Sequence, residues 1–521
     1  MKAITVYDTT LRDGTQGEGV SFSLQDKIDV ARRLDDLGVD YIEAGYPVSN
    51  PKDEAVFDAL RTEPLTHAVP VAFGMTRRVG AKAADDVTLQ GLVAAGTEAV
   101  AVVGKAWDFH VTKVLRTDLD ENLAMVRDSV AFLKGAGRTV FFDAEHFFDG
   151  HKVNAEYALG ALHAALDAGA DWLILCDTNG GCLPEEIEQI VAATIGEVGG
   201  AFGIHCHNDA GLAVANTLAA VRAGCTQVQG TINGLGERCG NADLCSVLPD
   251  LELKMGLECL GPTGLVKLTD ASRFVYDQAN MLIVPGQPYV GPSAFSHKGG
   301  MHVSAVTRER DSYEHVDPAA VGNTRRILVS ELSGRGAILA KVAGTRFEED
   351  TELQRKVLDE IQRLENAGYQ FESAEASFAL VVRRLAGLAE PFFELDHYNV
   401  VIKKDEHHDA VTEATVKLKV GGQWHHTVAE GDGPVNALDA ALRKALHPAF
   451  PNLAEMNLTD YKVRVINSGA GTAASVRVVI ESRDRDEHWG TVGVSENIID
   501  ASWQALADSI HYKLTKDRER S

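Results

Sequence analysis

The sequence alternates between short β-type runs and amphipathic helical stretches from residue 3 to about residue 250. The strand candidates of these eight units are residues 3–8, 41–46, 69–74, 99–104, 139–145, 172–177, 201–207 and 227–233. Such alternation is typical of parallel strands joined by crossover helices. Eight units in roughly 250 residues is the size of a (β/α)8 barrel. We therefore predict an α/β fold that opens with a TIM barrel over residues 1–262, with a doubly wound open sheet as the alternative.

The stretches between the strand candidates have the spacing of helices that pack on a sheet. In LQDKIDVARRLDDLG (24–38) and EYALGALHAALDAGA (156–170), apolar residues recur every three or four positions. Each stretch has a Gly near its end, which suits the left-handed C-cap of a helix. Polar residues gather at the carboxyl ends of strand candidates one, two, five, six, seven and eight. This favours the barrel, because its strand ends converge on one mouth.

The alternation stops after Pro262, and residues 263–388 read as a linker region with active-site loops such as VPGQPYVGPSAFSHKGGMH (284–302). A charged stretch at 348–368 predicts a solvated helix. Residues 389–521 contain an internal repeat. ATVKLKV (414–420), Trp424 and a helical stretch at 436–446 are echoed by ASVRVVI (474–480), Trp489 and a helical stretch at 498–514. Strands followed by a helix, taken twice, predict an α+β domain whose role is ligand sensing or dimer formation.

Composition argues against two classes of main partner. The chain has 50 Lys+Arg and 75 Asp+Glu, a net charge of −25, whereas nucleic acid or an anionic membrane would require a basic surface. No apolar run approaches the roughly 20 residues that span a bilayer, and the start MKAITVYDTT has no signal-peptide pattern. The seven Cys lie between Cys176 and Cys259 without a CxxC pair, which favours reduced thiols. We expect a cytoplasmic protein.

A His-x-His pattern is the first candidate for chemistry. His205 and His207 lie two apart on the seventh strand candidate, so their imidazoles point to the same face. They are either a pair of metal ligands or histidines that hydrogen-bond in the core. Asn241 follows strand eight, which is next to strand seven in a closed barrel, and Asp13 follows strand one, which is adjacent across the closure. Two imidazoles with amide and carboxylate oxygens suit a divalent cation, Mg²⁺ or Mn²⁺ first and Zn²⁺ as the alternative.

Arg12 precedes Asp13 at the end of strand one. Its guanidinium would polarise a developing oxyanion while Asp13 holds the metal. Taken alone, this segment predicts a surface ion pair between Arg12 and Asp13.

Three motifs carry a resemblance to a known family. DTTLRDG (8–14), IHCHNDAG (204–211) and NGLGERCGNA (233–242) together resemble the acyl-CoA-dependent 2-oxoacid condensing enzymes, which include 2-isopropylmalate, homocitrate and citramalate synthases. That group is similar in turn to metal-dependent lyases such as hydroxymethylglutaryl-CoA lyase. The resemblance extends through FSHKGGMH (295–302), SYEHVDP (312–318) and the C-terminal repeat. VGKAWDFHVTKVLRTDLDENLAM (103–125), FFDAEHFFDG (141–150) and CDTNGG (176–181) look most like the citramalate synthase branch.

The resemblance implies roles for individual residues. The metal ligands are Asp13, His205, His207 and Asn241, and the catalytic residues are Arg12, Glu145, His302 and Tyr313. Arg12, Thr178 and Glu43 are the substrate-binding residues, Arg12 beside the keto oxygen and Glu43 either near the pocket or tethering Arg12. Without the resemblance, Glu145 would be an ordinary loop carboxylate and Thr178 a helix N-cap. His297 has a weaker case and would order its loop.

The resemblance also implies a reaction. An acetyl thioester loses a methyl proton, the enolate attacks the ketone of a 2-oxoacid, and the thioester is hydrolysed. For the branch, the substrates are acetyl-CoA and pyruvate, the effector is isoleucine, and a homodimer lets His302 and Tyr313 reach the partner's site. The alternatives are another 2-oxoacid, a metal-dependent lyase and a non-enzymatic amino-acid sensor. Ala44, Tyr46 and Val48 depart from the branch pattern near the end of strand two, which leaves side-chain preference open.

Overall fold

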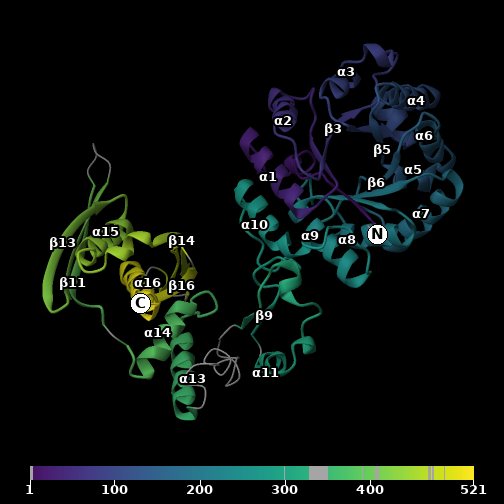
Figure 1. The fold of residues 1–521 in the computed structure, drawn as a ribbon. Helices are drawn as coiled ribbons and strands as arrows, with labels where there is room; N and C mark the ends of the chain where they lie inside the picture. The colour runs from purple at the N-terminus through teal and green to yellow at the C-terminus, as the bar shows by residue number, and fades with distance from the viewer. Residues whose placement is uncertain are drawn as a thin grey trace. The chain divides into compact units, whose positions relative to one another are not determined.

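The computed structural model describes residues 4–298, 300–327, 350–389, 391–404, 410–466, 471, 474–485 and 487–520. They form two compact units. The first runs to Phe295 and includes Val316–Arg325, and the second consists of Ser296–His315 and the described residues from Arg326 onward. In Figure 1 the first unit runs from purple to teal, and most of the second from green to yellow.

Eight parallel strands close into a barrel in the first unit. They are β1 (Thr5–Asp8), β2 (Tyr41–Gly45), β3 (Val69–Met75), β4 (Ala99–Lys105), β5 (Thr139–Glu145), β6 (Trp172–Asp177), β7 (Phe202–Cys206) and β8 (Gln227–Gly230). The barrel is closed by β1 and β8, with Thr5 opposite Gln227 and Asp8 opposite Gly230. Closure confirms the predicted TIM barrel and shows that the open-sheet alternative is wrong.

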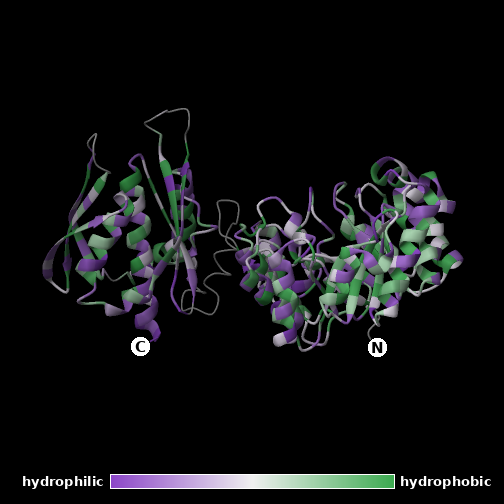
Figure 2. Cartoon of the chain, turned by 90° about the horizontal axis from the view of Figure 1, so that it is seen from above, coloured by the Kyte–Doolittle hydropathy of each residue, from purple (hydrophilic) through white to green (hydrophobic). Residues whose placement is uncertain are grey.

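Helices follow the strands in the expected alternation. They are α1 (Leu24–Leu37), α2 (Pro51–Thr62), α3 (Val87–Ala94), α4 (Leu119–Gly135), α5 (Phe147–Val153), α6 (Ala155–Asp167), α7 (Pro184–Val198), α8 (Ala213–Arg222), α9 (Leu244–Pro249) and α10 (Leu268–Gln278). Helix α1 shows how local sequence sets their limits. Ser23 and Asp26 form a capping box at its start, and Gly38, with φ 96°, ends it in the left-handed conformation. Hydrophobic and hydrophilic residues intermix along these helices (Figure 2), as helices packed on one face require.

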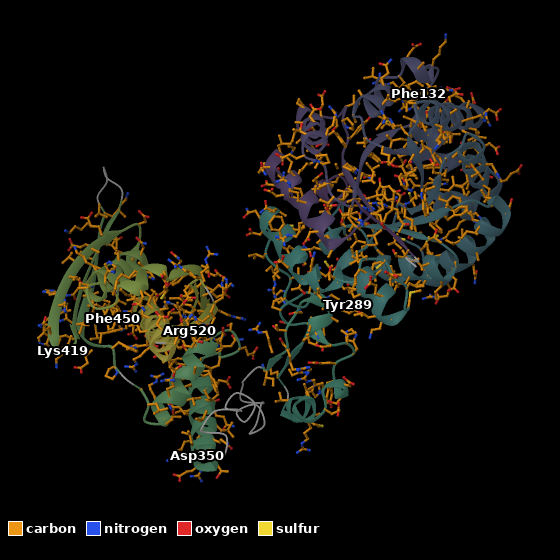
Figure 3. The ribbon with its side chains drawn as sticks, in the orientation of Figure 1. Phe132, Tyr289, Asp350, Lys419, Phe450 and Arg520 are labelled. Carbon is orange, nitrogen blue, oxygen red and sulfur yellow. The ribbon has the colours of Figure 1, made fainter. Side chains whose placement is uncertain are left out.

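The barrel has two apolar layers. Its interior is filled by the buried side chains of alternate strand residues, among them Tyr7, Val71, Ala101, Phe141 and Ile174. A second, larger layer lies between the strands and the helices. It contains the strand residues that alternate with the interior ones and point outward, such as Val6 and Phe142. Side chains fill the space between these elements (Figure 3). A packed interior leaves the carboxyl ends of the strands as the place where polar groups meet.

The second unit contains the predicted repeat. Strands β11 (Phe393–Lys403), β12 (Val411–Val420) and β13 (Gln423–Gly431) form one antiparallel sheet, followed by α15 (Pro434–Leu446). Strands β14 (Asn457–Val465), β15 (Val476–Arg483) and β16 (His488–Ser495) form another, followed by α16 (Ile498–Arg520). The α+β prediction is confirmed. Lys419 on β12 and Phe450 just after α15 mark the first half (Figure 3).

The two halves differ in burial. Trp424 and Trp489 each occupy the second position of the third strand of their sheet. Trp489 is 1% exposed and its indole N–H donates to Ser509 Oγ at 2.9 Å, whereas Trp424 is 56% exposed. Helix α16 and Trp489 belong to the same apolar core as β12 and α15, so the halves share a core although their sheets are separate.

The rest of the second unit precedes the repeat. It contains β9 (Ser296–His297), α11 (Gly300–Arg308), β10 (Arg326–Ile327), α13 (Thr351–Asn366) and α14 (Glu375–Leu385). The charged stretch at 348–368 therefore forms a helix within its described part. Among the residues that the structure describes, no helix is both long and apolar enough to cross a membrane.

A buried ion pair ties α1 to α2 beneath the end of β2. Lys27 is 2% exposed, and its Nζ lies 2.6 Å from Asp53 Oδ1 and 3.3 Å from the Ala44 carbonyl oxygen. Removing one partner of a buried pair leaves the other charge uncompensated, which costs about 3 to 5 kcal/mol. We expect Lys27→Met to lower the free energy of unfolding of the barrel by about this amount.

Differential scanning calorimetry checks this as a lower Tm of the barrel transition. Arg32→Ala is the control. Arg32 is on the same helix but its side chain is 48% exposed, so its loss should cost no more than about 1 kcal/mol. Equal effects of the two substitutions would contradict the prediction.

Candidate metal centre and active site

Three predicted metal ligands meet at the mouth of the barrel. Asp13 lies in the turn after β1, His205 is on β7, and His207 directly follows that strand. All three are buried, and a ligand atom of each lies within 4.8 Å of the others. His205 Nε2 is 3.2 Å and His207 Nε2 4.0 Å from Asp13 Oδ2. Closure of the barrel between β1 and β8 brings Asp13 to the two imidazoles.

Asn241, the fourth predicted ligand, completes the group. It forms an isolated β-bridge with His207, and its Nδ2 donates to Asp13 Oδ2 at 2.7 Å. Its Oδ1 is buried and accepts no hydrogen bond within the described residues. A buried oxygen acceptor without a donor, next to a carboxylate and two imidazoles, fits a divalent cation.

A second layer of contacts orients the ligands. His205 Nδ1 lies 3.0 Å from Gln229 Oε1, so its Nε2 faces Asp13. Ligating histidines in metal sites are held in the same way. Burial and the neighbouring His205 lower the pKa of His207 to about 4, so this imidazole is neutral at pH 7. Burial alone would raise the pKa of Asp13, but Arg12 and the two histidines hold it well below its usual range. Asp13 is therefore ionised.

Arg12 is fixed on one side of this group. Its Nε donates to Glu43 Oε1, and its NH1 lies 3.2 Å from Asp13 Oδ1. Its guanidinium carbon stacks 3.8 Å above the ring centre of Phe73. Glu43 is fully buried and also accepts a 2.6 Å hydrogen bond from the Tyr7 hydroxyl. Of the two roles considered for Glu43, the contacts support the tether of Arg12.

Glu145 and Thr178 lie at the ends of β5 and β6 on the same mouth. Glu145 makes an ion pair with Lys105, and its side chain is 24% exposed. Thr178 Oγ1 accepts from the backbone N–H of His146 at 2.9 Å. Helix α7 has Leu183 as its N-cap, so the N-cap reading of Thr178 is wrong.

One cavity of about 250 Å³ joins these groups. It is lined by charged and polar side chains from both sides of the mouth together with a few apolar ones: Arg12, Asp13, Gln16, Phe73, Val103, Asp143, Glu145, Cys176, Thr178, His205, His207, Glu237 and Arg238. The cavity thus has the metal group and Arg12 at one side and a carboxylate, Glu145, at another. Ala44, Tyr46 and Val48 are not among its lining residues, but the Tyr46 ring packs edge-on against Phe73, which is one of them.

Several further residues of this site are not among those predicted from the sequence. Asp143 lies two positions before Glu145 on β5, and burial together with Glu43 raises its pKa to about 7. Arg238 binds Asp209 and donates to the Thr178 carbonyl oxygen at 2.7 Å, which joins the loops after β6, β7 and β8. Lys105 is the last residue of β4. Its signal in the sequence is a polar residue at the carboxyl end of a strand, the same signal as at the six strand candidates named above.

His302 and Tyr313 belong to the second unit. Their rings stack with centroids 4.0 Å apart, so the structure brings these two predicted residues together. His297 Nε2 lies 3.0 Å from Glu314 Oε1, a contact that orders the segment, as expected for this residue.

A larger cavity of about 660 Å³ lies among α13, α14 and α16 of the second unit. Aromatic and aliphatic side chains such as Tyr369, Phe371 and Trp503 form much of its wall, with Asp508 and Arg384 among the charged residues. It contains none of the predicted catalytic residues.

Comparison with known proteins covers the whole chain. The profile of the HMGL-like family matches residues 3–275, that of the homocitrate synthase post-HMGL domain-like family residues 289–368, and that of the LeuA allosteric (dimerisation) domain residues 372–514. An (R)-citramalate synthase of Geobacter sulfurreducens is 52% identical over 100% of this chain and 99% of its own length.

Two further relatives share that name. The (R)-citramalate synthase of Aquifex aeolicus is 52% identical over 99% of this chain and 98% of its own length. The (R)-citramalate synthase of Synechocystis is 49% identical over 98% of this chain and 96% of its own length.

Proposed function

We propose that this chain, which belongs to the family of (R)-citramalate synthases within the HMGL-like enzymes, condenses acetyl-CoA with pyruvate to give (R)-citramalate and free CoA. The observation that carries the proposal is the single cavity in which Asp13, His205 and His207 face Arg12 and Glu145. The condensation needs a group that activates the ketone and a base that deprotonates the acetyl methyl, and this cavity contains both.

A divalent cation held by Asp13, His205, His207 and Asn241 would supply Lewis acidity toward the carboxylate and keto oxygens of pyruvate. Mg²⁺ or Mn²⁺ is our first choice because two of the four donors are oxygens, with Zn²⁺ as the alternative. Asp13 is ionised and His207 is neutral at pH 7, as metal binding requires of these two residues.

Arg12 would donate to the keto oxygen of pyruvate and stabilise the negative charge that develops there. Its anchors, Glu43 and Asp13, leave part of the guanidinium facing the cavity and hold it without rearrangement. Thr178 would bind the pyruvate carboxylate, because its hydroxyl accepts from His146 and keeps its own proton for donation.

Glu145 would be the base. Its carboxylate lines the cavity opposite the metal group and is partly exposed, so an acetyl thioester entering from solvent can reach it. The methyl C–H bond breaks, the proton moves to Glu145, and the resulting enolate carbon attacks the keto carbon of pyruvate. The keto oxygen becomes an alkoxide that takes a proton from solvent, and Glu145 returns its proton to solvent. Water then hydrolyses the thioester and releases CoA.

The remaining features of the chain suit an effector-regulated homodimer, which we propose as its working form. We assign residues 1–262 to the catalytic barrel, 263–388 to the linker and 389–521 to a regulatory domain that binds isoleucine. The match to the LeuA allosteric (dimerisation) domain supports this assignment. The stacked pair His302 and Tyr313 would act in the partner subunit's site. The seven cysteines are free thiols, which supports the cytoplasm as its location.

The proposal is tested by release of free CoA from acetyl-CoA with each of four 2-oxoacids: pyruvate, 2-oxoisovalerate, 2-oxobutyrate and 2-oxoglutarate. We expect turnover with pyruvate, dependent on Mg²⁺ or Mn²⁺ and lost with chelator. If the protein preferred a larger 2-oxoacid, that compound would take the place of pyruvate in the proposal, and the proposed mechanism would be unchanged. Cleavage of citramalate-type thioesters without condensation would favour a lyase.

Addition of isoleucine should lower the rate of CoA release. If isoleucine changed neither this rate nor the Tm of the full-length protein, it would be rejected as the effector.

A further inference from the structure

Lys105 ends β4 directly beside the proposed base. Strands β4 and β5 pair in register with Lys105 opposite Glu145, and the Lys105 Nζ contacts Glu145 Oε2. Both side chains are about one quarter exposed, 22% and 24%, and Glu145 lines the cavity, so its contact with Lys105 places the ammonium group at the edge of that cavity.

The position of Lys105 is held by its surroundings. Asn122 Nδ2 donates to the Lys105 carbonyl oxygen at 2.9 Å, and the next residue, Ala106, donates its N–H to the Glu145 carbonyl oxygen at 3.1 Å. Asn122 itself is fully buried and hydrogen-bonds the Tyr157 hydroxyl at 2.7 Å. The ammonium group therefore extends from a fixed strand end.

The proposed reaction creates two separate negative charges. One appears on the keto oxygen of pyruvate, next to Arg12. The other appears earlier, on the thioester oxygen of acetyl-CoA, when Glu145 removes the methyl proton. Arg12 is bound to Glu43 and Asp13 on the far side of the cavity. A donor to the thioester oxygen must lie near Glu145, because oxygen and methyl carbon are attached to the same carbonyl carbon, and a cationic donor would stabilise the charge most directly.

We propose that Lys105 is a further catalytic residue that stabilises the enolate oxygen of acetyl-CoA; this rests on the proposed function. As Glu145 takes the methyl proton, the C–H electron pair moves into the C–C bond and the carbonyl pair moves onto oxygen, where the Lys105 ammonium binds it. When the enolate carbon attacks pyruvate, the thioester carbonyl re-forms and Lys105 is released.

The test is exchange of the acetyl-CoA methyl protons with D₂O, followed by mass spectrometry. The full-length protein is used with Mg²⁺ and with oxamate, a pyruvate analogue that the enolate does not attack. We expect Lys105→Met to slow exchange and to lower kcat by about 100- to 1,000-fold, as does loss of one oxyanion donor. Lys105→Arg should retain part of the exchange rate and part of kcat. The control Lys134→Met removes a partly exposed ion pair with Asp171 and should leave both rates unchanged.

A second substrate separates enolate stabilisation from mere orientation of Glu145. In the acetyl dithioester of CoA, sulfur replaces the carbonyl oxygen and accepts hydrogen bonds weakly. The deficit of Lys105→Met should therefore shrink with the dithioester. An equal deficit with both substrates, or wild-type exchange in Lys105→Met, would overturn the proposal.

The two proposals fail in different ways. If the wild-type protein exchanged the methyl protons of acetyl-CoA but condensed none of the 2-oxoacids, the proposed function would be rejected. The Lys105 variants could still be compared by their exchange rates. If the wild-type protein catalysed condensation but did not exchange the methyl protons of acetyl-CoA, the enolate would not form before the attack on pyruvate. The proposed role of Lys105 would then be rejected.

Discussion

Replacement of Glu145 by glutamine should lower kcat for citramalate formation about a thousandfold, within the range typical of lost general-base catalysis. The amide keeps the size of the side chain and accepts a hydrogen bond from Lys105, but it cannot take the methyl proton. Binding of Mg²⁺ and pyruvate depends on residues elsewhere in the cavity and should stay unchanged. The measurements are free-CoA release for kcat and isothermal titration for binding.

The matched control is Glu188→Gln on α7, which removes a partly exposed ion pair with Arg222. Its kcat should equal that of the unmodified protein. If Glu145→Gln kept activity within tenfold, Glu145 would not be the base. If it lost pyruvate binding together with activity, Glu145 would belong to the substrate site instead.

Replacement of His207 by alanine should abolish stoichiometric Mn²⁺ binding and reduce turnover below about one thousandth of the original rate. The expected loss corresponds to several kcal/mol of charge stabilisation, the usual contribution of a catalytic cation. Because His207 is neutral at pH 7, the substitution removes a ligand without changing the charge of the site. Mn²⁺ binding is measured by titration calorimetry and turnover by CoA release.

His67→Ala is the control for the metal experiment. His67 is 53% exposed and lies two residues before β3, at the end of the barrel opposite the mouth. It should bind one Mn²⁺ per chain and keep full activity. Undiminished Mn²⁺ binding by the His207→Ala protein would contradict the four-ligand site, and chelator-resistant turnover by the unmodified protein would contradict the need for a cation.

The local elements of the fold were predictable from the sequence. All eight strand candidates are strands; two have the predicted bounds, and the other six differ by one to three residues at their ends. Strand and helix periods are set by residues close in the chain, and caps such as Ser23 and Gly38 act within one turn. The repeat at the C-terminus was predictable for the same reason, since both copies have the same order of strands and helix.

The site was predictable in part. His205 and His207 were predicted from their spacing on the seventh strand candidate, Asp13 and Asn241 because they follow strands one and eight, and all four match family motifs; the structure brings them together. Lys105 was not predicted, because its contact with Glu145 joins two strands that are distant in the sequence. The tether from Glu43 to Arg12 was one of two alternatives, and only the burial and contacts of Glu43 separate them.

The sequence alone therefore determined the order and kind of the secondary structure elements, and which strand ends carry reactive side chains. Tertiary structure decided which of those ends are neighbours. The pairing of β1 with β8 joins Thr5 to Gln227 and brings Asp13 to His205 and Asn241. It also decided burial, as Trp424 and Trp489 show. The physical reason is that periodicity depends on nearby residues, whereas adjacency and burial depend on contacts between segments that are more than 200 residues apart at the metal site.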